Sequence, residues 1–219
     1  MQHILHFLID LKFNNNRNWM KANDARYREA KATFEALVDK VLEGLKTFDK
    51  SLAEVKATEC IFRVYRDARF SANKEPYKTN FGAFMAPGGR KSEFAGYYMH
   101  FEPDSSFLGG GIYMPQPDIL KALRNHIFHN PAAFKEIIND KSFKKFFPLL
   151  WGDTLKTAPA GFPKDFKDID LLKFKHYVVS YDVSNEFWTG KNLIADITGV
   201  FEKQYHFNKF LDEAIAKIR

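Results

Sequence analysis

The N-terminal part of the chain repeats apolar residues at the spacing of amphipathic helices. The first apolar stripe is formed by Ile4, Leu5, Leu8 and Leu11. The asparagines at 14–16 interrupt it with residues that favour turns and helix caps. A second stripe, with charged residues on its other face, continues to about residue 47. The pattern predicts a short helix over 4–13 and a longer helix capped by Asn16 or Asn18.

From residue 60 the period of the apolar positions changes from near four to two. In the stretch CIFRVY (60–65), one set of alternate positions is Cys, Phe and Val, which predicts a β-strand. Segments rich in Pro, Gly, Asp and Ser separate the regions that follow. Further strands are expected at about 80–86, 95–102, 106–114 and 174–183.

The remaining apolar periods predict helices. Pro117 opens one helix, and Asn130 followed by Pro131 is typical of the start of another. The last helix is expected over about 192–217. Residues 155–170, with two prolines and a glycine, indicate an extended loop.

Helices, then antiparallel strands, then helices are the order of elements in an α+β fold. We therefore expect a mainly antiparallel sheet packed against several helices, including long N- and C-terminal ones. No linker or repeat interrupts the pattern, so a single globular domain is expected over residues 1–219. Hydrophobic residues make up 45% of the chain and aromatic residues 16%, which excludes a disordered polypeptide.

The single cysteine, Cys60, excludes an intramolecular disulfide and a cysteine-based zinc cage. This is typical of a reducing compartment, so a cytoplasmic protein is expected. The first residues carry no basic leader, and no apolar run approaches the roughly 20 residues of a membrane span. No membrane association is predicted.

Lys and Arg outnumber Asp and Glu by 33 to 27, and five of these basic residues are concentrated within 62–78. Three arginines within seven positions repel one another unless an anion lies between them, and the arginine fork suits a carboxylate or phosphate. The cluster, at the end of a predicted strand, therefore predicts a site for a small anionic ligand. Ion pairs with acids elsewhere in the fold would explain it without a ligand. The basic residues are Arg63, Arg66, Arg69, Lys74 and Lys78.

A second candidate feature is a polar strand face opposite glycines. If Glu102 pairs with Phe107 across a four-residue loop, His100 faces Gly109 and Tyr98 faces Gly111. Glycine within a strand marks close approach of a ligand or of another backbone, so this face could form the wall of a pocket. Aromatic cover of the glycines is the structural alternative.

Chemical candidates in the sequence are few. His100 and Asp67 are the available proton-transfer groups near the basic cluster and are the weak catalytic candidates. The glycines at 109–111 lack the Lys-Ser or Lys-Thr of a phosphate loop. No metal site, cofactor, reaction type or oligomeric state is predicted.

Several segments together resemble a known family, the conserved hypothetical proteins of bacteria and fungi grouped as domain of unknown function 2461. The segments are NNNRNWM (14–20), FRVYRDARFSANKEPYKTNFGA (62–83), PGGRKSEFAGYYMHFEP (87–103), FLGGGIYMP (107–115) and LLKFK (171–175). The resemblance covers nearly the whole chain and implies no activity. Met20 departs from it, because phenylalanine is expected there.

Three functions follow from these features. The first is binding of a small anionic ligand, to which transferase or hydrolase chemistry could be added. In this hypothesis the pocket is closed by Lys156, Lys173 and Lys175. The second is nucleic-acid binding by segment 62–84, with Tyr65, Phe70 or Tyr77 stacking on bases. The third is a scaffold in which Glu102, Asp104 and Asp118 neutralise the arginines. The ligand-binding candidates are Arg63, Arg66, Arg69, Lys74, Tyr77, Lys78, Tyr98 and His100.

Overall fold

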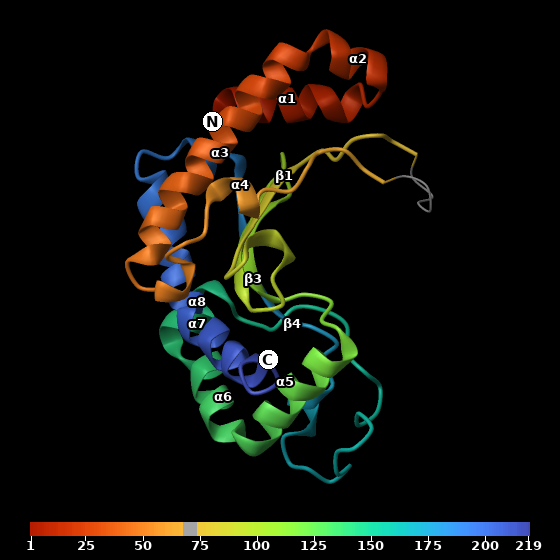
Figure 1. The fold of residues 1–219 in the computed structure, drawn as a ribbon, viewed down its shortest axis with the longest axis vertical. Helices are drawn as coiled ribbons and strands as arrows, with labels where there is room; N and C mark the ends of the chain where they lie inside the picture. The colour runs from red at the N-terminus through yellow and green to blue at the C-terminus, as the bar shows by residue number, and fades with distance from the viewer. Residues whose placement is uncertain (68–73) are drawn as a thin grey trace.

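The structure, a computed structural model, describes residues 1–67 and 74–219 (Figure 1). Three helices form its N-terminal part, with α1 and α2 side by side at one end of the molecule and α3 leading back toward the sheet. Asn16 caps α2 as predicted, since its side chain accepts a hydrogen bond from the Trp19 amide at 2.9 Å. These helices are α1 (Gln2–Phe13), α2 (Arg17–Ala22) and α3 (Asp24–Lys46).

A four-stranded antiparallel sheet with the order β1-β2-β3-β4 lies at the centre. Its strands are β1 (Phe81–Met85), β2 (Gly96–Phe101), β3 (Ser106–Ile112) and β4 (Tyr177–Val183). A long connection between β3 and β4 carries three more helices, and a fourth follows β4. These are α5 (Pro117–His129), α6 (Pro131–Asn139), α7 (Lys141–Phe146) and α8 (Leu193–Ile215). The predicted α+β fold is confirmed.

The two long helices, α3 and α8, pack against each other and against one face of the sheet. Alternate strand residues point to this face and are buried, because neighbouring side chains of a strand point to opposite sides. The buried set on the inner strands includes Tyr97, Met99, Phe101 and Leu108. The opposite face carries Phe84, Tyr98, His100, Phe107 and Ser180, which are partly exposed. It is this face that forms a cleft.

One helix prediction needs correction. The single helix expected from residue 16 to about 47 is divided at Asn23, which leaves the helical conformation with φ −109° and ψ 20°. The Asn23 amide nitrogen donates to the carbonyls of Trp19 and Met20, which ends α2 before α3 begins. A continuous apolar stripe does not reveal such a change of direction.

The strand predicted over 60–65 is wrong. Cys60 ends the short helix α4 (Ala57–Cys60), and the residues after it form only isolated pairs, Ile61 with Ala83 and Tyr65 with Tyr77. Cys60, Ile61 and Val64 are buried and Phe62 is partly buried, so the segment packs against the core without forming a hydrogen-bonded ladder.

The predicted register of β2 and β3 is also wrong, by two residues. His100 pairs with Phe107 and Tyr98 with Gly109. The connecting turn is tighter than expected, because the Ser105 amide donates to the Glu102 carbonyl at 3.2 Å, and Asp104 adopts a left-handed φ of 63°. The side chains still point to the predicted faces, since a slip of two residues preserves the alternation.

No helix among the described residues is both long and apolar enough to cross a membrane.

Candidate functional site

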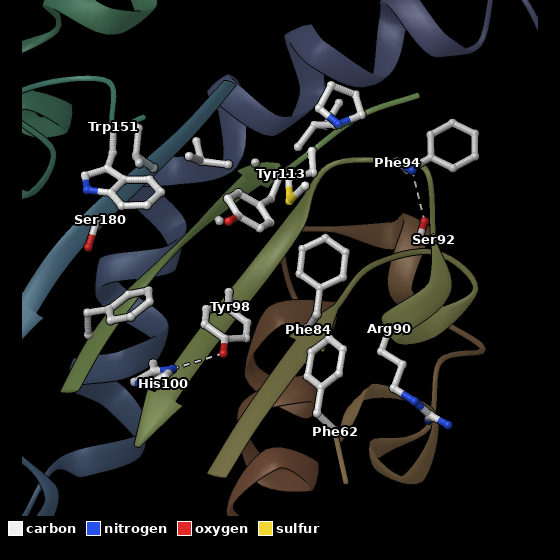
Figure 2. Close-up of a pocket in the computed structure, with 18 of the residues that line it drawn as sticks. Phe62, Phe84, Arg90, Ser92, Phe94, Tyr98, His100, Tyr113, Trp151 and Ser180 are labelled. Carbon is white, nitrogen blue, oxygen red and sulfur yellow. Dashed lines mark hydrogen bonds between the residues drawn. The ribbon is translucent and has the colours of Figure 1, made fainter. Parts of the chain in front are cut away.

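A cleft of about 890 Å³ lies on the sheet face opposite α3 and α8 (Figure 2). Its floor is formed by side chains of the four strands, and its walls come from the segment before β1, the loop between β1 and β2, and the turn after β3. Figure 2 shows aromatic rings from several elements around one hollow. The main aromatic lining residues are Phe62, Phe84, Tyr98, Phe107, Tyr113 and Trp151. Such a concave, aromatic surface is typical of small-molecule sites.

Glycines of the strands make room for these rings. A β-carbon on Gly82 would lie 2.8 Å from the Tyr98 hydroxyl oxygen, and one on Gly96 would lie 2.7 Å from the Phe84 ring. Gly109 instead allows close approach of β4, since its β-carbon would lie 2.1 Å from the Val179 carbonyl oxygen. The glycines therefore explain the shape of the floor by aromatic cover and by strand approach.

A chain of hydrogen bonds crosses the floor from Tyr98 to Thr79. The His100 ring lies 3.0 Å from the Tyr98 hydroxyl through Nδ1 and 3.0 Å from Glu102 Oε2 through Nε2. The other Glu102 oxygen accepts the Thr79 hydroxyl at 2.5 Å. Because an ionised carboxylate only accepts, His100 carries its proton on Nε2 and accepts from Tyr98 through Nδ1.

The charges along this chain are set by burial and by the hydrogen bonds. The hydrogen bond from His100 is the main cause that holds the pKa of Glu102 below its ordinary value. Burial, with the charge of Glu102 as a smaller cause, raises the pKa of Tyr98 to about 12. At neutral pH Glu102 is therefore ionised and Tyr98 is neutral.

Glu102→Gln should reduce the free energy of unfolding by about 1–2 kcal/mol, because glutamine offers one acceptor oxygen to two partly buried donors, Thr79 and His100. His100 should also lose its fixed tautomer, which long-range ¹⁵N–¹H spectra of the ring would detect as a change in the ring nitrogen shifts. Glu93→Gln, at an exposed ion pair with Arg219, is the matched control and should alter neither quantity much. An unchanged tautomer in Glu102→Gln would contradict the assignment.

Lys78 is the predicted basic residue that reaches the cleft. Its ammonium group lies 5.5 Å from the centroid of the Phe62 ring. Within 1–67 and 74–219, no carboxylate lies within 4.0 Å of it. Burial lowers the pKa of Lys78, and the charges of Arg63 and Arg66 lower it further.

Arg90, which the sequence did not single out, also lines the cleft, but its guanidinium is engaged elsewhere. It donates to the carbonyl oxygens of Thr58 at 3.3 Å and Glu59 at 3.0 Å. Figure 2 shows the guanidinium turned away from the aromatic rings. Lys91 lines the cleft from an exposed position. Of the cations among the described residues that line the cleft, Lys78 is thus the one that is partly buried.

The other basic candidates that the structure describes do not line this cleft. Arg66 and Lys74 line a shallower pocket of about 520 Å³ beside the Asn15–Asn18 turn, and Arg66 lies 3.7 Å from a Glu75 oxygen. Arg63 is exposed on the surface. Arg69 and Phe70 lie outside the described residues.

Of the remaining candidates, Tyr98 and His100 share the cleft with Lys78. Tyr77 is only 5% exposed, so its ring lies beneath the surface. Asp67 lines neither of the two cavities. The structure therefore brings together Lys78, Tyr98 and His100, and it places Arg66 and Lys74 in a second cavity.

The acids of the scaffold hypothesis have other partners. Glu102 binds His100 and Thr79, Asp104 bonds to Asn185 at 2.7 Å, and Asp118 lies 3.4 Å from Arg219. Two of the lysines expected to close the pocket are likewise engaged at acids outside the cleft: Lys173 bonds to Asp170 at 2.7 Å and Lys175 lies 3.6 Å from Asp153.

One contact joins two segments of the family resemblance. The Asn15 side chain donates to the Tyr77 carbonyl at 3.0 Å and accepts from the Tyr77 amide at 3.1 Å. These two bonds resemble a strand pair and hold the segment that carries Lys78 against the turn between α1 and α2.

Sequence reasoning missed most of the aromatic wall. Tyr113 and Trp151 are 61% and 57% exposed and lie 6.4 Å apart between ring centroids at the cleft rim. Phe107 stacks on His100 with centroids 4.7 Å apart. The high phenylalanine content was visible in the sequence, but the rings that face the cleft are selected by register and tertiary packing.

Comparison with known proteins gives a family and no named relative. The chain has no significant match among curated proteins or among solved structures. A family model described as conserved hypothetical protein (DUF2461) matches residues 3–210, nearly the whole chain. The chain therefore belongs to the DUF2461 family, as the motifs of residues 62–83 and 87–103 indicated.

Proposed function

We propose that the cleft binds a small organic molecule that has an apolar, ring-sized body and one anionic group. The observation that carries this proposal is the ammonium group of Lys78, which lines a cleft rich in aromatic rings and has no carboxylate within ion-pair distance among the described residues. The two acids that line the cleft, Glu93 and Asp182, make no ion pair with it. A partly buried charge without a partner is costly, and a ligand carboxylate or phosphate would supply that partner. The rings would cover the body of the ligand.

The enclosed shape favours a small ligand over a polynucleotide. Stacking on bases needs accessible rings. Of the two described rings predicted to stack, Tyr77 is buried, and Tyr65 is 50% exposed and packs edge-on against Tyr77 at 5.2 Å between centroids.

Fluorescence titration with anilinonaphthalene sulfonate tests this proposal, because the dye combines an aromatic body with one anion. We expect saturable binding to the native protein and weaker binding of the neutral analogue N-phenylnaphthylamine. Lys78→Met should weaken binding of the anionic dye about tenfold or more, the value of one charge-assisted contact, and leave binding of the neutral dye nearly unchanged.

Lys91→Met is the matched control, since Lys91 lines the same cleft from an exposed position. It should preserve the preference for the anionic dye. Equal affinity of the wild-type protein for the two dyes, or an unchanged preference in Lys78→Met, would overturn the proposal. A steep loss of affinity with salt in both lysine variants alike would indicate a diffuse basic surface instead.

A further inference from the structure

The environment of Lys78 combines features that make a lysine amine nucleophilic. The side chain lies against the Phe62 ring at the wall of the cleft, with its nitrogen 5.5 Å from the ring centroid. No carboxylate among the described residues holds it in the charged form by an ion pair. Lysines that attack carbonyl groups are activated in this way, by an apolar wall or by a neighbouring cation.

Both kinds of activation act on Lys78. Burial is the larger cause that lowers its pKa, and the positive charges of Arg63 and Arg66 are the next ones. A lower pKa increases the fraction of neutral amine at a given pH, and only the neutral amine carries the free electron pair needed for attack.

We propose that Lys78 forms a reversible imine with the carbonyl group of an oxo acid bound in the cleft. This rests on the proposed function, because the carboxylate of the oxo acid is the anionic group of that ligand. In a 2-oxo acid the carbonyl carbon adjoins the carboxylate. The carboxylate can therefore enter the cleft as the partner of the Lys78 ammonium group, which brings the carbonyl carbon within reach of the nitrogen once that group has lost a proton to solvent.

The reaction needs no oxidant, reductant or cofactor. The neutral Nζ attacks the carbonyl carbon, a C–N bond forms, and the electron pair of the C=O double bond moves to the oxygen, which takes up a proton while the nitrogen loses one. The hydroxyl group of this carbinolamine takes a second proton and leaves as water while the C=N bond forms. The imine nitrogen then releases its remaining proton.

Proton transfer groups are present in the same cleft. Tyr98 and His100 line it and are joined by a hydrogen bond of 3.0 Å, and Glu102 orients the histidine from the other side at 3.0 Å. This arrangement can exchange the protons of the carbinolamine step with solvent. In this proposal the chain of hydrogen bonds on the floor of the cleft transfers protons, whereas a purely structural network would only hold its side chains in place.

Reductive trapping tests the imine directly. The full chain is incubated at neutral pH with pyruvate and sodium cyanoborohydride, then digested, and every lysine is quantified by mass spectrometry. We expect the reduced adduct on Lys78 at an occupancy several-fold above that on the exposed Lys91, since a lowered pKa leaves more of the Lys78 amine neutral. An even spread over the lysines, or an unmodified Lys78, overturns the proposal.

Two further arms separate this proposal from the proposed function. Lys78→Arg keeps the charge, so it should retain binding of anilinonaphthalene sulfonate while the adduct disappears. Acetone, a ketone that lacks a carboxylate, should label Lys78 much less than pyruvate, and equal labelling would overturn the oxo acid as the substrate class. If the wild-type protein binds the dye but no reduced adduct forms on Lys78, the proposed function stands and the imine proposal is wrong. If the wild-type protein does not bind the dye, the proposed function is wrong.

Discussion

Gly110→Ala should prevent stable folding or reduce the free energy of unfolding by more than about 3 kcal/mol. Gly110 has a φ of 145°, a conformation that residues with a β-carbon rarely adopt. An added β-carbon would lie 2.0 Å from the Gly96 carbonyl oxygen and 2.6 Å from Gln204 Nε2. Urea unfolding followed by circular dichroism measures the loss.

The surroundings of Gly110 leave little room for relaxation. Gly96 belongs to the neighbouring strand β2, and its carbonyl oxygen accepts a hydrogen bond from Gln204 at 3.0 Å. Gln204 lies on α8 and is fully buried. Moving either group would disturb the contact between the sheet and α8.

Gly199→Ala is the matched control. Gly199 lies within α8, and nothing lies within 4 Å of the position that a β-carbon would take there. Alanine there should leave stability unchanged or raise it by about 0.5–1 kcal/mol through its higher helix propensity. A Gly110→Ala protein as stable as Gly199→Ala would show that the sheet accommodates a side chain at this position.

Asp212→Asn should make the protein more stable at pH 8 than the wild type and equally stable near pH 4. Asp212 lies on α8 and accepts a hydrogen bond from the Ala95 amide at 2.7 Å. Burial raises the pKa of its carboxyl to about 7; the Ala95 hydrogen bond opposes this, the charge of Asp49 adds to it, and Lys209 lowers it.

The direction of the effect follows from proton linkage. The folded protein holds the Asp212 proton more tightly than the unfolded chain, whose aspartate titrates near pH 4. The stabilisation from this group is therefore complete below pH 4 and is lost as the pH rises through about 7. Asparagine keeps the acceptor for the Ala95 amide without the charge, so the variant should gain on the order of 3 kcal/mol relative to the wild type between pH 4 and 8.

Denaturant unfolding at several pH values measures the free energy of unfolding of the wild type and of Asp212→Asn. Groups that titrate in both proteins contribute equally to the two values, so their contribution cancels in the difference. Asp196→Asn, at an exposed aspartate in the first turn of the same helix, serves as the control and should show no such trend. Parallel stability curves for the wild type and Asp212→Asn would contradict the raised pKa.

The elements that depend on local spacing were predictable. The four sheet strands end within three residues of the ranges expected from the alternation and turn signals, α5 and α6 begin at the prolines that indicated them, and α8 begins within one residue of the expected start. Long-range hydrogen bonds decide the rest. The register of β2 and β3 depends on how tightly the chain turns at Asp104, and the extended stretch at 60–65 lacks the partner strand that its period suggests.

The candidate site was predictable only in part. The sequence reveals which residues are cationic, but the cavity that each one faces depends on tertiary contacts. Arg66 and Lys78 come from two segments that pair through the bonds Arg66 N to the Pro76 carbonyl and Lys78 N to the Val64 carbonyl. The Arg66 side chain nevertheless lines the shallower pocket, whereas the Lys78 side chain lines the cleft. Glu102, two residues from His100, could be found from strand periodicity alone.

The bonds between Asn15 and the Tyr77 backbone would give the N-terminal helices an influence on the affinity for the proposed anionic ligand. They join residues 62 positions apart and hold the backbone immediately before Lys78. A displacement of the α1–α2 turn would thus move the cation without touching the aromatic floor. Substitutions in that turn are expected to alter the selectivity for anions over neutral molecules of the same shape, even though no residue of the turn lines the cleft.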